Sequence, residues 1–198
     1  MRRNGPRIRS SDLPVVLCLL GLAVGSPCSA RAECGVPAPD YAADRRITVS
    51  GHEIRMQVHS SGNRTREEAD LGGGLRVTIQ GLSGGRTVTF DPQARQGMEL
   101  PSPHGVRPPG RVVDEVRPDG TRGRIQQVQS HGRWLEVSRT TCRADGVMLM
   151  QNFVSIDPKG QEITGSVTQD HIQLGAQPAA LFEVPPGVHV APAAARRR

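Results

Sequence analysis

Aromatic side chains are scarce in this sequence, at 3% of 198 residues. They are Tyr41, Phe90, Trp134, Phe153 and Phe182. So few rings offer little surface on which nucleic-acid bases could stack. The chain also lacks an apolar run of the roughly 20 residues that a membrane-spanning helix needs. A length of 198 residues with 36% hydrophobic content is instead typical of one ordinary folded domain.

The N-terminus has the pattern of a secretory signal peptide. Arginines at positions 2, 3, 7 and 9 precede a short apolar segment from Leu13 to Val24, and Ala30 and Ala32 place small residues where signal peptidase cleaves. This order predicts export to the periplasm with cleavage near Ala32. A short buried helix is the alternative interpretation of the apolar segment. Pro27 before Cys28 does not fit a lipoprotein signal, which has a small residue at that position.

Positive charge is concentrated at the two ends of the chain. The formal net charge is +6. Residues 1–32 contain five arginines and one aspartate, so the chain beyond them carries +2. Without Arg196, Arg197 and Arg198, residues 33–195 carry −1. The domain therefore has no basic excess for nucleic-acid binding, and residues 191–198 are predicted to be a disordered basic tail.

Two cysteines, Cys34 and Cys142, lie beyond the predicted signal peptide. In an oxidising compartment an even number of cysteines is typical of a disulfide. The alternative is two separate thiols, with Cys142 buried as a small apolar residue.

Hydrophobic residues alternate with polar ones along most of the chain. The pattern is clear around Ile54–Val58, Leu75–Ile79 and Val88–Phe90, and a longer apolar run covers 147–156. Turn signals such as Ser61-Gly62-Asn63 and Asp145-Gly146 separate these segments. A period of two with closely spaced turns predicts a mainly β protein, an antiparallel meander with one solvent-facing side.

Prolines mark the organisation of this meander. Four prolines between Pro101 and Gly110 exclude a central strand there and predict a stiff crossing between two halves of a single domain, residues 33–190. Near the end, Gln177–Gly187 predicts one helical turn opened by Pro178 and ending at Phe182. We therefore expect at most one or two short helical turns.

No group of residues indicates catalysis. His52 and His59 are an odd number of residues apart, so on one regular strand they face opposite sides and do not share a metal. No nucleophile, base and orienting group can be named together. The sequence thus predicts no enzyme activity, no metal site and no cofactor.

Several short phrases resemble exported proteins of Gram-negative bacteria related to the outer-membrane lipoprotein carriers, the LolA-like group. The most distinctive is Leu181-Phe182-Glu183-Val184-Pro185-Pro186-Gly187 near the C-terminus. Others, in the same order along the chain, are Asn63–Glu68, Val88–Pro92 followed by Met98–Pro101, and Cys142–Val147. Together they cover roughly residues 45–188.

This resemblance implies a strongly curved antiparallel sheet, a half-barrel with an apolar concave side. It implies a non-catalytic periplasmic protein that holds a lipid, an acyl chain, or a lipoprotein or outer-membrane partner there. The alternative is a structural or envelope-interaction protein whose apolar residues simply pack on each other as core. The candidate residues of the apolar side are Ile54, Met56, Val58, Leu75, Val77, Ile79, Val88, Phe90, Met148 and Met150.

Overall fold

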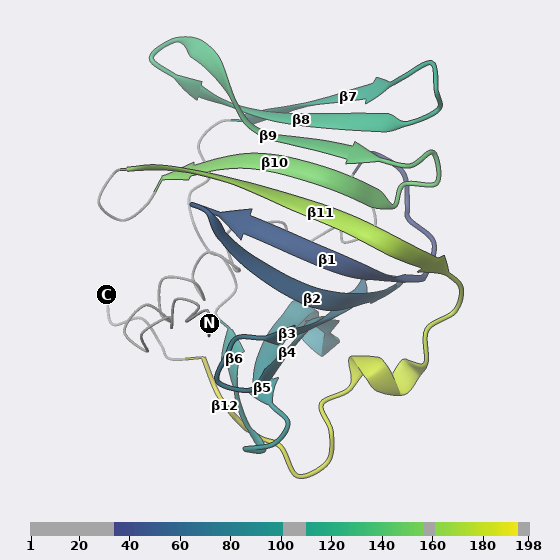
Figure 1. Cartoon of the computed structure of the whole chain (residues 1–198), viewed down its shortest axis with the longest axis vertical. Coiled ribbons are helices and arrows are strands. Elements are labelled where there is room, and N and C mark those ends of the chain that lie inside the picture. The colour runs from purple at the N-terminus through teal and green to yellow at the C-terminus, as the bar shows by residue number, and fades with distance from the viewer. Residues whose placement is uncertain (1–33, 101–109, 157–160, 194–198) are drawn as a thin grey trace, which may run out of the picture.

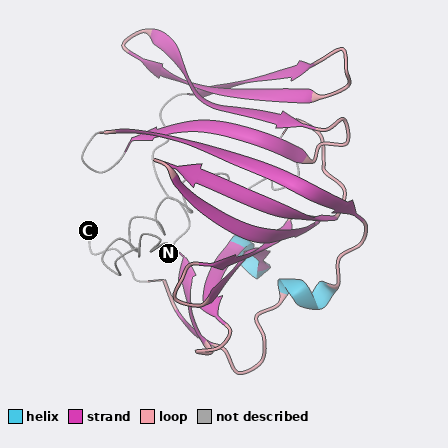
Figure 2. Cartoon of the chain, viewed as in Figure 1, coloured by secondary structure: helices cyan, strands magenta, loops and turns pink. Residues whose placement is uncertain are grey.

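A computed structural model of the chain describes residues 34–100, 110–156 and 161–193. These residues form twelve strands in one open sheet, with two short 3-10 turns, η1 (Ser83–Gly85) and η2 (Ala179–Phe182) (Figures 1 and 2). The mainly β class and the few helical turns predicted from the sequence are confirmed. The strands are β1 (Tyr41–Val49), β2 (His52–Ser61), β3 (Arg64–Asp70), β4 (Leu75–Leu82), β5 (Arg86–Asp91), β6 (Gln96–Leu100), β7 (Gly110–Val116), β8 (Arg122–Ser130), β9 (Arg133–Cys142), β10 (Met148–Ile156), β11 (Glu162–Leu174) and β12 (His189–Ala191).

The strand order is β12-β6-β5-β4-β3-β2-β1-β11-β10-β9-β8-β7. Two meanders, β1 to β6 and β7 to β11, meet in the middle of the sheet where β1 pairs with β11. Figure 1 shows β7 to β11, β1 and β2 following one another, while β3 to β6 turn away beneath them. β6 and β7 flank the proline-rich segment and lie toward opposite ends of the sheet. All pairings are antiparallel except that of β12 with β6.

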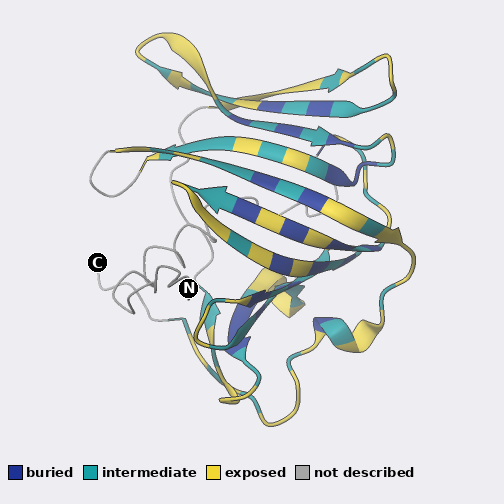
Figure 3. Cartoon of the chain, viewed as in Figure 1, coloured by how far each residue is buried: buried dark blue, intermediate teal, exposed yellow. Residues whose placement is uncertain are grey.

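Tight turns and alternating side chains account for the meander. Ser50 and Gly51 join β1 to β2 with φ of 49° and 80°. Positive φ at both central residues of a two-residue turn matches the right-handed twist of the strands. In the strands that follow, buried and exposed residues alternate, as in β1 and β2 (Figure 3).

One side of the sheet, which we call the Met56 face, carries the larger buried cluster. Met56 is opposite Arg45 on β1 and Ala69 on β3, so these residues share a face. The cluster includes Ile47, Met56, Val58, Val167 and Met148. Cys34 and Cys142 belong to the same cluster and are joined by a disulfide, with their Cα atoms 6.2 Å apart. The bridge therefore ties the start of the described chain to the end of β9.

The other side, which we call the Phe90 face, has its own apolar cluster over β4 and β5. Val77 and Ile79 are opposite Phe90 and Val88, and these four residues are buried. The C-terminal strap (Pro178–Ala191) packs over them through Val184, Val188 and Val190 and ends as β12 beside β6. The helical turn predicted at its start is confirmed as η2, with Phe182 buried.

Some sequence predictions lie outside the described residues. They are the signal peptide at 1–32, most of the proline-rich crossing at 101–110, and most of the basic tail at 191–198. The assignment of residues 33–190 to a single domain stays a prediction. The described part of the chain contains no helix with the length and apolarity required to cross a membrane.

Candidate functional site

A buried polar group lies in the centre of the Met56 face. The Arg45 guanidinium donates to the Glu67 carboxylate at 2.6 Å across the intervening strand β2. It also donates to the side-chain oxygen of Gln169 on β11 at 3.0 Å. Gln169 in turn donates to the backbone carbonyl of Met148 at 2.7 Å. Arg45 and Glu67 are each only 8% exposed.

Mutual pairing explains how these charges are tolerated away from water. An unpaired buried charge costs several kcal/mol, whereas a hydrogen-bonded pair offsets much of that penalty. The Arg45, Glu67 and Gln169 side chains come from three strands, β1, β3 and β11. Their pairing therefore fixes the relative positions of strands from both meanders.

Apolar side chains surround this polar group. Ile47 and Val167 are opposite each other on β1 and β11. Met56 and Val58 come from β2 and are buried. Ile54 and Phe153 are half-buried and pack against the same cluster. The face thus carries a contiguous buried apolar cluster with a charged pair among its side chains.

A hollow of about 450 Å³ opens at one end of β1, β9, β10 and β11. Its volume exceeds the roughly 300 Å³ at the lower end of ligand pockets. Val137, Phe153 and Val154 supply its apolar lining, and most of the remainder carries hydroxyl or amide groups. The Phe153 ring occupies the space over Gly165, the residue opposite it on β11.

The ten predicted apolar residues do not share one face. Ile54, Met56, Val58 and Met148 lie with the cluster on the Met56 face. The expectation of one continuous lining is wrong for the remaining six, which lie on the opposite side of the sheet. Met150 is 40% exposed there, and the other five form or border the cluster of the Phe90 face: Leu75, Val77, Ile79, Val88 and Phe90.

The register between β3 and β4 explains why the apolar residues of β4 lie on the opposite side of the sheet from Met56. Glu67, on the Met56 face, is opposite Thr78, so Val77 and Ile79 point to the other side. In β10 an extra residue between Met148 and Met150 shifts the pairing with β9. Because a one-residue shift reverses the side to which the following side chains point, Met148 is buried with the cluster and Met150 is not.

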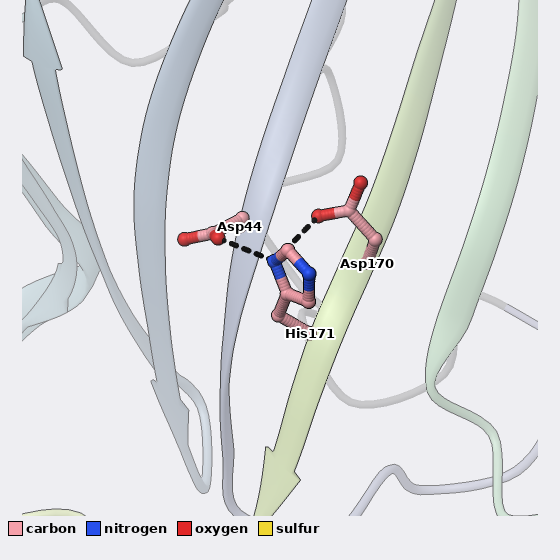
Figure 4. A group of neighbouring side chains, drawn as sticks. All are labelled: Asp44, Asp170 and His171. Atoms are coloured by element: carbon pink, nitrogen blue, oxygen red, sulfur yellow. Dashed lines mark hydrogen bonds and ion pairs between the residues drawn. The ribbon is translucent and has the colours of Figure 1, made fainter.

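A second group of polar side chains, Asp44, Asp170 and His171, lies exposed on the Phe90 side of β1 and β11 (Figure 4). His171 Nδ1 is 2.8 Å from Asp44 and 3.4 Å from Asp170. The hydrogen bond to Asp44, followed by the charge of Asp170, raises the pKa of His171 above its ordinary value. His171 has a φ of 48° at a bulge between β1 and β11.

Among the described residues, these three side chains are the group that brings carboxylate and imidazole ligands together. Sequence spacing did not predict it, because Asp44 is far from Asp170 along the chain and the bulge sets the direction of His171. The three side chains satisfy one another in solvent, and we assign them no metal.

Comparisons with known proteins bear on the fold. No family model and no curated protein matches the chain. Among solved structures, an uncharacterised conserved protein from Thermus thermophilus is similar, with a TM-score of 0.50 and 14% identity over 91% of this chain and 99% of that one. A LolA superfamily protein from Nitrosomonas europaea has a TM-score of 0.43 and 11% identity, over 82% of this chain and 97% of that one.

The chain is therefore a single-sheet β protein with a fold like that of the Thermus protein. The second similar structure bears the name of the group that the sequence phrases resemble. At these identities the likeness concerns the fold alone.

Proposed function

We propose that this protein is a non-catalytic binding protein of the periplasm, which holds a lipid, an acyl chain or the lipidated segment of a partner on its Met56 face. The contiguous apolar cluster of that face is the observation that carries the proposal. Ile47, Met56 and Val167 extend it across three neighbouring strands. Phe153 packs against the same cluster and also lines the hollow at one end of the sheet.

Two sequence features support the compartment and the ligand class. The N-terminal pattern of basic, apolar and small residues is that of an exported protein. The phrases that resemble the LolA-like group imply an apolar ligand. The buried polar group is also consistent with a binding role. Arg45 donates hydrogen bonds to Glu67 and Gln169, which holds the three strands in fixed positions as the scaffold of a binding face.

The test begins with protein purified from the envelope of its host. We expect lipid extraction followed by mass analysis to recover an acyl-containing molecule in an amount comparable to the protein. We also expect a fluorescent fatty acid to bind saturably to delipidated protein. Phe153→Ala should weaken that binding about tenfold, since an aromatic side chain buries a large apolar area against a ligand.

Met150→Ala is the matched control, because Met150 is an exposed apolar residue of the same strand as Phe153 on the opposite side of the sheet. Circular dichroism of both variants checks that they are folded. Absence of extracted lipid together with absence of saturable probe binding would refute the proposal.

The deep burial of the cluster on the Met56 face favours a second function. Val58 and Cys142 have no exposed surface, as in a face that is filled by its own side chains. Such a protein would be a structural or envelope-interaction component without a ligand. The same experiment distinguishes the two functions, because a self-filled face yields neither lipid nor probe binding.

A further inference from the structure

The strand β7 forms one end of the sheet, and no other described strand pairs with its outer edge. In the described part of the chain its hydrogen-bonded neighbour is β8 (Figure 1). Six of its seven residues are exposed (Figure 3), and Val116 reaches 69%. Outer edges of this kind present unpaired backbone N–H and C=O groups on which another strand can add.

We infer that β7 pairs antiparallel with β7 of a second copy of this chain, about a twofold axis through Val113. Charge complementarity selects this partner. In that pairing Arg111 lies opposite Glu115 of the second copy, and Glu115 lies opposite its Arg111. Val113 lies opposite Val113. The edge is therefore complementary to itself, which is the requirement for a closed twofold dimer.

Other registers lose this match. An axis through Asp114 places Asp114 opposite itself and Val113 opposite Glu115. An axis through Val112 places Arg111 opposite Val113. Neither Arg111 nor Glu115 then has an opposite charge directly across from it. Opposite charges directly across an antiparallel pair stabilise it, and like charges destabilise it. The sequence Gly110–Val116 thus favours one register over its neighbours.

The intramolecular contacts of these two charges leave part of each side chain able to pair with a second copy. Arg111 stacks on Trp134 with its guanidinium carbon 4.6 Å from the ring centre. Its Nε donates to Gln127, and within the described part of the chain its two terminal nitrogens donate to no other group. Glu115 forms a long ion pair with Arg139 at 4.0 Å, beyond hydrogen-bond distance, while Arg139 is held by Glu136 at 2.8 Å. Stacking on Trp134 also holds the guanidinium beside the strand, in place for a partner carboxylate.

The carboxylate of Asp114, in contrast, is fully paired within its own chain. It accepts two hydrogen bonds from Arg124, at 2.7 and 3.1 Å. Because its charge is compensated within the chain, it can lie opposite Val112 of the second copy without an added charge partner. The dimer would join the two sheets edge to edge, with both Met56 faces on the same side.

Sedimentation over a range of protein concentrations tests the inference. We expect a monomer–dimer equilibrium for the purified protein. Arg111→Glu or Glu115→Arg should each raise the dimer dissociation constant about tenfold or more, because each places like charges opposite each other twice. The double variant with both changes restores opposite charges and should return the constant to within about threefold of the original.

Glu162→Arg is the control for the change in net charge, since Glu162 is exposed at the start of β11, far from β7 in the strand order. It should leave dimerisation unchanged. A second measurement does not depend on the charges. Oxidation of the Val113→Cys variant should join two copies by a disulfide, because directly opposite residues lie within disulfide reach. A protein that stays monomeric at about 1 mM, or a dimer that does not crosslink through position 113, would overturn the inference.

Discussion

Two ion pairs at the centre of this sheet differ in their exposure to water. Arg45 and Glu67 are buried on the Met56 face. His171 and Asp44 are exposed on the opposite side. The buried pair is fixed by its hydrogen bonds, and its loss would leave a charge without a partner in the core. The exposed pair is screened by solvent and depends on the protonation of the imidazole.

The Asp44–His171 pair should make the stability of the protein depend on pH. Because Asp44 and then Asp170 favour the imidazolium form, the pKa of His171 lies above 6.5 in the folded protein. Stability gained from this pair is therefore complete below the unfolded pKa of about 6.5 and is lost as pH rises through the folded pKa. NMR titration of the imidazole should show the raised pKa, and Asp44→Asn should lower it.

Glu183→Gln removes an exposed carboxylate from the C-terminal strap and should leave the His171 titration in place. An Asp44→Asn protein with an unaltered His171 pKa would contradict the assignment of Asp44 as the main cause.

At the scale of strands, the close approach of β5 and β6 depends on Gly97. A Cβ atom built on Gly97 would lie 2.6 Å from the Phe90 Cβ and 2.7 Å from the Thr89 carbonyl oxygen. Gly97 is the residue opposite Phe90. The absence of a side chain at Gly97 thus lets the β6 backbone approach the β5 backbone closely beside Phe90.

We expect Gly97→Ala to lower the free energy of unfolding by about 1–3 kcal/mol, the usual cost of forcing extra volume into a packed site. Urea denaturation measures this change. Gly73→Ala adds the same methyl group at a position with nothing within 4 Å and should change the free energy by less than about 0.5 kcal/mol. Equal effects of the two substitutions would show that packing against Phe90 is not the cause.

The strands also show how much of the sheet the alternation of the sequence could predict. Alternation identified Ile54, Met56 and Val58 as one apolar row and Val77 with Ile79 as another. Four of these residues are buried, and Ile54 is half-buried. Alternation did not predict that the two rows face opposite sides, because a period of two leaves the register between neighbouring strands open. The buried pair of Arg45 and Glu67 was also missed, since each stands in a polar stretch whose partner comes from another strand.

At the scale of the whole molecule, one covalent link spans the described chain. Cys34 and Cys142 are 108 residues apart in sequence and adjoin the same cluster as Val167 on β11. A crosslink closing so long a loop restricts the unfolded chain strongly. The bridge therefore contributes stability to the contacts between the two meanders.

Replacing both cysteines by alanine should lower the free energy of unfolding by about 2–5 kcal/mol. Urea denaturation of the variant and of the original protein measures the difference. A reducing agent should destabilise the original protein by a similar amount and leave the variant unchanged. An original protein that is insensitive to reduction would contradict the prediction.

The pairing of β1 with β11 sets the order in which the sheet can be completed. As the chain is synthesised, β1 to β6 can pair with each other while the second edge of β1 waits for β11, which follows the entire second meander. Pairings between segments so distant in sequence form slowly. Until β11 arrives, β1 is itself an open edge, so the growing chain needs protection from aggregation at the position that becomes the centre of the finished sheet.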